Sequence, residues 1–267
     1  MSITRRRPLV AAFALLAALV VAIPVLASDR AGAADSQVYV VHGIPGVAVD
    51  VYAGGTLALP GFQPGTTAGP LTLPQGDLPV LVFAAITDPP QAAADRGDSP
   101  VIDQVIPVPS GADVSLVANI EGGTPNLQAF ANDLSAVPAG SARVTVRHTA
   151  DAPAVDVLVN GAVAIPGLAP GTEASAVLPA GTYDIQVQLT DGTPIAALSP
   201  GTVDIPAARN VIVYAVGSAS DQDFPLGLVQ QVLEVPVQDA PVTPTTPTTA
   251  PAPAAAAAAT ASPSFTG

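Results

Sequence analysis

The sequence has no cysteine and no tryptophan, and aromatic residues make up only 4 % of its 267 residues. Without cysteine, disulfides, thiolate nucleophiles, iron–sulfur clusters and cysteine-ligated zinc are all excluded. With so few aromatic residues, a core must be built from valine, isoleucine, leucine and alanine, and valine in alternating runs favours β-strands. Lysine is absent as well, and this arginine-, alanine- and glycine-biased usage is typical of a GC-rich genome such as an actinobacterial one.

Positive charge is scarce, and the formal net charge is −13. Residues 1–34 have the pattern of a signal peptide: arginines at positions 5 to 7, an apolar run from Leu9 to Leu26, and small residues near Ala27 and Ala34. Removing this segment takes away four arginines and one aspartate, which changes the net charge to −16. We therefore expect a secreted or cell-surface protein that does not bind nucleic acid or anionic lipid. The alternative is an uncleaved N-terminal anchor, since the apolar run is nearly long enough to span a bilayer.

An internal duplication dominates the rest of the chain. Shifting the sequence by 106 positions aligns Val38–Ala68 with Val144–Ala174 without a gap, and about half of the aligned residues are identical. The phrase "HGIPGVAVDVYAGG" from His42 thus recurs as "HTADAPAVDVLVNG" from His148. Self-similarity of this extent predicts two copies of one structural unit, which we place at residues 37–135 and 142–237.

Each copy has the pattern of an all-β domain. Short alternating segments such as "ARVTVRH" and "VDVLV" recur every 8–15 residues with proline and glycine between them, and no helical period is present. Asn160-Gly161, with Gly54-Gly55 at the same place in the first copy, predicts a two-residue hairpin turn. The fold class we predict is two tandem immunoglobulin-like antiparallel β-sandwiches. The first copy has an extra polar loop at 87–100, and residues 238–267 are predicted to be a disordered tail rich in proline, threonine and alanine.

The repeat resembles a known bacterial family. "RVTVRHTADAPAVDVLVNG", followed by "LPAGTYDIQV" and "NVIVYAVG", is similar to the extracytoplasmic family called domain of unknown function 4397 (DUF4397). The resemblance covers both copies, although Thr149-Ala150 is one residue shorter than the family pattern and Gly43–Gly46 replaces its acidic turn. It implies secreted or surface-exposed tandem β-sandwiches with no assigned activity. It supplies no catalytic residues.

The only two histidines each precede an aspartate by eight residues, which makes His42 with Asp50 and His148 with Asp156 the candidate site residues, together with Asp151. A carboxylate that orients an imidazole would suit metal binding or acid–base chemistry. One histidine and one aspartate per copy are, however, too few ligands for a closed transition-metal site. The alternating pattern places His148 on the inward face of its strand. We therefore expect these residues to have structural roles, and we assign no catalytic residue, no cofactor-binding residue and no metal ligand.

Other chemical roles have weaker support in the sequence. A hydrolase using His148 would need a nucleophile on a sharp turn, and no Gly-x-Ser-x-Gly occurs. Calcium remains an alternative, through the loop aspartates (Asp95, Asp98, Asp103) or through Asp221 and Asp223, although neither set has a known loop spacing. Arg96-Gly97-Asp98 spells a tripeptide that some adhesion receptors recognise. The sequence thus favours a non-enzymatic envelope or extracellular module, structural or binding, whose partner is an unidentified envelope or extracellular component. A small-ligand, calcium-binding or adhesion protein comes second, and a hydrolase third.

Overall fold

The computed structural model describes residues 34–238, which belong to one compact unit. Residues 1–33 of the predicted signal peptide and 239–267 of the predicted tail lie outside this range. The described residues form β-strands and two short 3-10 helices, η1 (Ala93–Asp95) and η2 (Ala196–Leu198), and contain no α-helix. No helix within 34–238 has the length and apolar character needed to span a membrane. The predicted all-β class is confirmed.

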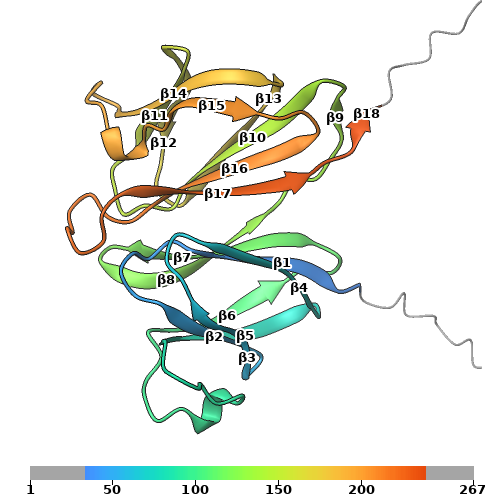
Figure 1. Ribbon diagram of the computed structural model, residues 1–267, viewed down its shortest axis with the longest axis vertical. Helices are drawn as coiled ribbons and strands as arrows, with labels where there is room; N and C mark the ends of the chain where they lie inside the picture. Colours follow the sequence, from blue (N-terminus) through green and yellow to red (C-terminus); the bar gives the residue numbers. More distant parts are fainter. Residues whose placement is uncertain (1–33, 239–267) are drawn as a thin grey trace, which may run out of the picture. The chain divides into compact units, whose positions relative to one another are not determined.

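The first sandwich consists of two four-stranded sheets that enclose an apolar core (Figure 1). Its first sheet has the order β4-β1-β7-β8, formed by Thr67–Leu73, Ser36–His42, Asp113–Glu121 and Thr124–Ala131. Its second sheet has the order β3-β2-β5-β6, formed by Thr56–Phe62, Val49–Ala53, Gly76–Ala84 and Ile102–Val108. Alternate residues of both sheets point inward, so that Val38, Val51, Val80 and Leu116 meet in one core.

The second sandwich repeats this arrangement strand for strand. The order β13-β10-β16-β17 is formed by Thr172–Pro179, Ser141–His148, Arg209–Val216 and Gly227–Glu234. The order β12-β11-β14-β15 is formed by Ala162–Leu168, Val155–Val159, Gly181–Leu189 and Gly201–Ile205. The predicted duplication is therefore also a duplication of topology. The exact limits at 37–135 and 142–237 stay a prediction.

The sandwich architecture is confirmed, but its strand order differs from that of an immunoglobulin domain. Immunoglobulin domains place the first, second, fifth and fourth strands in one sheet. Here the first and second strands of each repeat lie in different sheets, and the first strand pairs in parallel with the seventh, as β1 does with β7 and β10 with β16. The other strand pairs of both sandwiches are antiparallel, as predicted, and these two pairs are the exceptions. Alternation in sequence does not reveal this because it reports which residues face inward, not which strands are neighbours.

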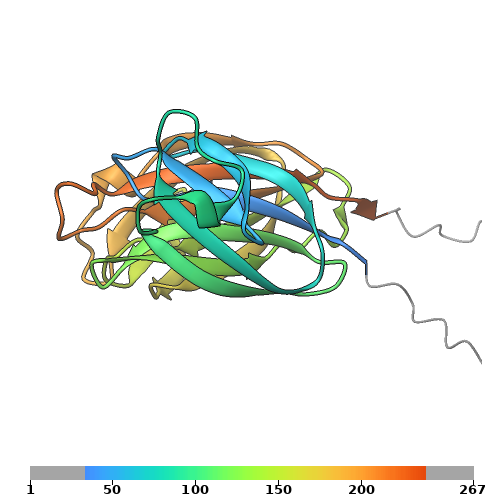
Figure 2. The same cartoon turned by 90° about the horizontal axis from the view of Figure 1, so that it is seen from below.

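The predicted turns form as expected. Asn160 and Gly161 have φ of 51° and 79°, and Gly54 and Gly55 have φ of 57° and 80°. Positive φ at both central residues is what a type I′ hairpin turn requires. The loop at 87–100 contains the turn η1 and no named strand, and it lies against the first sandwich (Figure 2).

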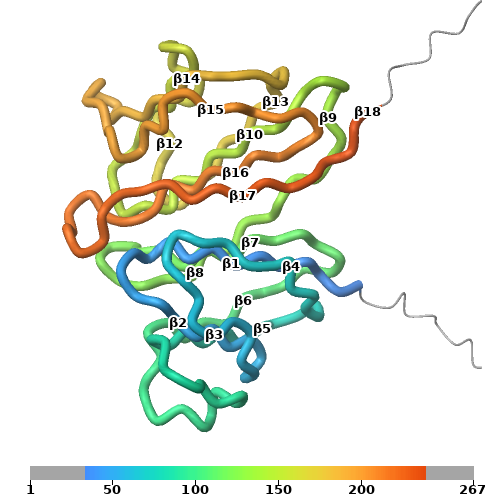
Figure 3. The backbone as a smooth tube through the Cα atoms, in the orientation of Figure 1, coloured from blue at the N-terminus to red at the C-terminus, as the bar shows by residue number. Residues whose placement is uncertain are grey.

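The segment that joins the two sandwiches is also ordered. Val137–Pro138 forms the short strand β9, which pairs in parallel with β18, Val237–Gln238 (Figure 3). Gln238, which we assigned to the disordered tail, is thus part of a strand.

The two sandwiches share an apolar interface. A buried cluster contains residues from both repeats: Val41, Val117, Phe130, Ile212, Tyr214, Val216, Val229 and Leu233. Beside it, the Arg147 side chain is only 1 % exposed and donates to the Asn132 side chain, the Ala131 carbonyl oxygen and the Tyr214 hydroxyl at 2.8–2.9 Å. Its guanidinium carbon lies 4.7 Å from the centre of the Phe130 ring. A desolvated arginine with this many partners fixes one sandwich against the other.

Candidate functional site

Each histidine is the last residue of the first strand of its repeat, and its side chain points into the space between the two sheets. His148 is fully buried, and its Nε2 is 2.9 Å from the carbonyl oxygen of Pro153. His42 is equally buried, with Nε2 2.9 Å from the carbonyl oxygen of Val47. A carbonyl only accepts, so each Nε2 carries the proton. Each Nδ1 is then a bare acceptor, and it has no partner within residues 34–238.

Burial keeps both imidazoles neutral. It lowers the pKa of His42 and of His148 below the usual value of 6.5, because desolvation disfavours the imidazolium. The hydrogen bond to the carbonyl oxygen opposes this effect and is the smaller cause in both cases. An imidazole held neutral and enclosed is poorly suited to carry protons to a substrate.

The paired aspartates bind backbone groups. Asp156 Oδ1 accepts from the amide of Gly167 at 2.7 Å, and Asp50 Oδ1 accepts from the equivalent Gly61 amide at 2.8 Å. Each carboxylate thus anchors the irregular end of the neighbouring edge strand, where the glycine has a positive φ. Across the described part of the chain, no hydrogen bond joins a histidine to its paired aspartate. The spacing of eight residues therefore reflects two structural roles in one repeated unit.

Asp50 has an additional role that Asp156 lacks. Its Oδ2 is 2.7 Å from Nη1 of Arg96, and both side chains are at most 1 % exposed. Arg96 also pairs with Asp98 at 2.7 Å and lies 4.6 Å from the centre of the Phe83 ring. The hydrogen bonds from Arg96 lower the pKa of Asp98. The side chain of Arg96 is thus covered between the 87–100 loop and the outer face of the second sheet of the first sandwich, and it is 1 % exposed.

Asp151 lies between the two sandwiches. Its Oδ2 accepts from the Gly123 amide of the first repeat at 3.2 Å. Within residues 34–238, no group of three or more histidine, aspartate or glutamate side chains is placed to hold a metal ion. The loop aspartates that we considered for calcium are therefore not brought together.

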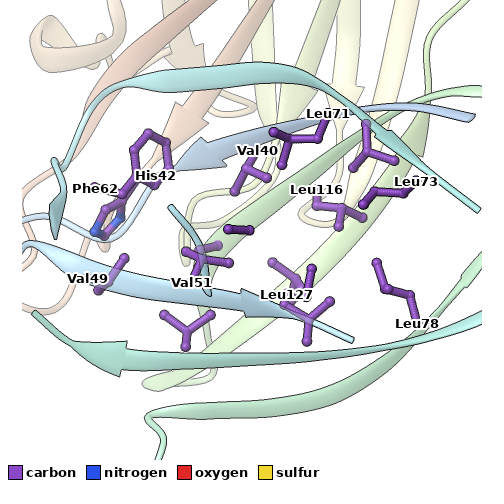
Figure 4. A pocket seen from close by; sticks show the side chains of 16 residues that line it. Val40, His42, Val49, Val51, Phe62, Leu71, Leu73, Leu78, Leu116 and Leu127 are labelled. Carbon is purple, nitrogen blue, oxygen red and sulfur yellow. The ribbon is translucent and has the colours of Figure 1, made fainter. Parts of the chain in front are cut away.

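The two sandwiches also differ in the space between their sheets. The first has a cavity of about 20 Å³, and the second has one of about 170 Å³ at the equivalent place. Figure 4 shows the smaller cavity, with Phe62, Leu71 and Leu116 among the side chains that fill it. His42 and His148 each lie at one end of the cavity in their own sandwich.

Comparison with known proteins agrees with the predicted family. The model of the family described as "Domain of unknown function (DUF4397)" matches residues 36–157 and 149–242. The chain belongs to this family. No curated protein matches it. Among solved structures, the fimbrial anchor protein Mfa2 from Porphyromonas gingivalis matches at 11 % identity, covering 75 % of this chain and 98 % of that one with a TM-score of 0.21. A TM-score this low does not establish a common fold.

The sequence pattern does not predict two features of this DUF4397 protein, the buried environment of Arg147 and the cavity in the second sandwich. Arg147 follows an inward valine by one position, so alternation correctly places it on the outer face of its sheet but does not show that a second sandwich covers that face. The pattern of apolar and polar residues does not predict the cavity either, because the residues that change its volume are apolar in both copies. A comparison of side-chain size between aligned positions of the two copies could have found the cavity.

Proposed function

We propose that this DUF4397 protein is exported and acts as a non-enzymatic extracellular or envelope module that binds a partner or ligand. The observation that carries the proposal is the bonding of the histidine–aspartate motif. In both repeats the imidazole is buried and bound to a backbone carbonyl, and the carboxylate is bound to backbone amides. The chemical groups that could have formed an active site therefore stabilise the fold.

Export is supported by the N-terminal sequence and by the acidic composition. The arginines at positions 5 to 7, the apolar run and the small residues that follow have the order of a signal peptide. Fractionation tests this part of the proposal. The full chain should reach the envelope or medium, and a chain that starts after Ala34 should stay in the cytoplasm.

The non-enzymatic part is tested with His148→Gln and Asp156→Asn. We expect the purified full chain to hydrolyse p-nitrophenyl esters no faster than buffer does. Turnover that disappears in His148→Gln while circular dichroism shows an intact fold would contradict the proposal. His42→Gln is the matched control, since it changes the equivalent residue of the other repeat.

A further inference from the structure

The second sandwich contains an apolar space between its sheets that side chains largely fill in the first sandwich. Its volume is about 170 Å³, and of the side chains around it only that of His148 is polar. A cavity of about 150 Å³ lined by apolar side chains stays dry and is large enough for a benzene-sized molecule. Empty space of this size is destabilising, because the lining atoms lose dispersion contacts. A bound apolar molecule would restore those contacts.

Three substitutions between the repeats open this space. Strand register makes Leu71 equivalent to Ala176, because each pairs with the matching valine of the first strand, Val38 or Val144. In the same way, Leu116 is replaced by Val213.

The third substitution lies in the other sheet. Phe62 and Leu168 pair with the matching residues Val49 and Val155, so phenylalanine is replaced by leucine. Other aligned positions change in both directions. Ile106 to Val203 loses a carbon atom, whereas the gains are Ala53 to Val159, Val80 to Ile185, Val108 to Ile205 and Leu78 to Tyr183, of which Tyr183 does not line the larger cavity.

The residues that line the cavity extend along β10 from Val144 to His148, four residues apart, which corresponds to about 13 Å in a strand. The cavity separates two apolar clusters of the second sandwich, one around Val157 and Leu198 and one around Ile205 and Val211. A hydrocarbon chain can contact residues at both ends of this lining, whereas a single ring cannot.

The cavity also has an opening. Among its lining residues, Ala164 on β12 and Ala176 on β13 are exposed, and these strands are edge strands of the two sheets. In the first sandwich, the larger Leu71 takes the place of Ala176 and is half-buried. The replacement of leucine by alanine thus leaves a gap at the edge through which a narrow molecule could enter.

We infer that the second sandwich binds an uncharged, unbranched hydrocarbon chain in the cavity between its two sheets, entering between β12 and β13. Among the lining residues there is no lysine, arginine, aspartate or glutamate. A charged group would therefore be buried there without a partner, at a large cost in free energy. A terminal hydroxyl could donate to Nδ1 of His148, but the equivalent atom of His42 is unpartnered beside a filled cavity, so that atom alone does not identify a ligand. The inference rests on the proposed binding function and names its ligand class.

The test is titration of the full chain with 1-octanol by calorimetry, together with the thermal midpoint. We expect saturable binding of one octanol per chain and a midpoint that rises with octanol concentration. The triple variant Leu168→Phe, Ala176→Leu, Val213→Leu copies the residues of the first repeat into the second. It should bind octanol at least tenfold more weakly. Val177→Leu, on the exposed face of the same edge strand, is the matched control and should bind like the wild type.

Two results would overturn the inference: no saturable binding by the wild type, or unchanged affinity in the triple variant. If the triple variant does not fold, Ala176→Leu alone decides, because it restores the leucine of the first repeat at the exposed edge and adds only one larger side chain to the cavity. Co-sedimentation of the chain with phosphatidylcholine vesicles would identify a lipid acyl chain as the source of the hydrocarbon, whereas octanol binding without co-sedimentation would identify a free molecule. Ester turnover that depends on His148 would reject the proposed function without affecting octanol binding, so the two failures are distinguishable.

Discussion

At the scale of single residues, several polar side chains of this protein are buried and stabilise its fold through hydrogen bonds. His42 and His148 are neutral imidazoles that hold a loop through Nε2, and Arg147 is a cation enclosed between two sandwiches. Such groups stabilise a fold only while their charge state and their partners are maintained. For each group we therefore expect the stability of the fold to depend on pH or on a single substitution.

The histidines predict a loss of stability in mild acid. Burial lowers both pKa values in the folded state, so the unfolded chain binds more protons once the pH falls below about 6.5. The stabilisation is fully present above that pH and is lost as the pH falls toward the folded pKa. We expect the free energy of unfolding in urea to fall between pH 7 and pH 5.5, by at most about 2.5 kcal/mol for the two histidines together. The double variant His42→Gln/His148→Gln should flatten this dependence, and an unchanged slope would assign it to carboxylates instead.

Arg147 predicts a large effect from a single side chain. Arg147→Ala leaves the Asn132 and Ala131 oxygens and the Tyr214 hydroxyl without their shared donor. We expect a loss of about 3–5 kcal/mol in urea unfolding. Arg209→Ala is the matched control, because Arg209 is 35 % exposed and pairs with a glutamate that is 84 % exposed. It should cost less than about 1 kcal/mol, and equal effects of the two variants would contradict the structural role of Arg147.

At the scale of elements, a buried ion pair joins the loop at 87–100 to the first sandwich, beside hydrogen bonds such as that from the Tyr52 hydroxyl to the Pro90 carbonyl oxygen. Arg96 reaches Asp50, which also accepts from the amides of Gly61 and Ile86. In the second repeat, Asp156 keeps only the glycine amide. The repeats thus provide a comparison within one chain between the same aspartate with and without a loop attached to it.

Asp50→Asn should release this loop. The substitution removes the buried one of the two carboxylates that Arg96 binds and leaves Asp98, and we expect a loss of about 1.5–3 kcal/mol. Limited trypsin digestion should then cleave after Arg96, which is enclosed in the wild type. Asp156→Asn should cost about 1 kcal/mol and leave cleavage at Arg96 unchanged. Equal protection of Arg96 in both variants would show that other contacts hold the loop.

The strands and turns also show which parts of the fold could be predicted from the sequence. Alternation and the Asn160-Gly161 turn predict strands and hairpins correctly, because both depend on local backbone chemistry. The same alternation correctly predicts that the two histidines face inward at the ends of their strands. The parallel pairing of β1 with β7 does not follow, since it joins strands that are far apart in the chain. The cavity does not follow either, because Leu71 and Ala176 satisfy the same apolar pattern with different volumes.

At the scale of the whole molecule, the apolar interface makes the two sandwiches depend on each other. Ile212, Tyr214 and Val41 are fully buried in the cluster they share. Hydrogen bonds cross the interface beside them, including Ser115 to Gln231 at 2.9 Å and Asn119 to the Thr149 carbonyl oxygen at 3.1 Å. Because an exposed interface of this kind would be costly to each sandwich alone, we expect the chain to unfold in one step.

Ile212→Asp tests this cooperativity. The isoleucine faces the shared cluster rather than the core of its own sandwich, so the introduced carboxylate is desolvated only while the sandwiches stay together. Differential scanning calorimetry should show one transition for the wild type and two for the variant, with the calorimetric enthalpy exceeding the van't Hoff enthalpy. Val105→Asp, at a position 58 % exposed, should keep a single transition. Two transitions in the wild type would mean that the sandwiches unfold independently and that the interface contributes little to their stability.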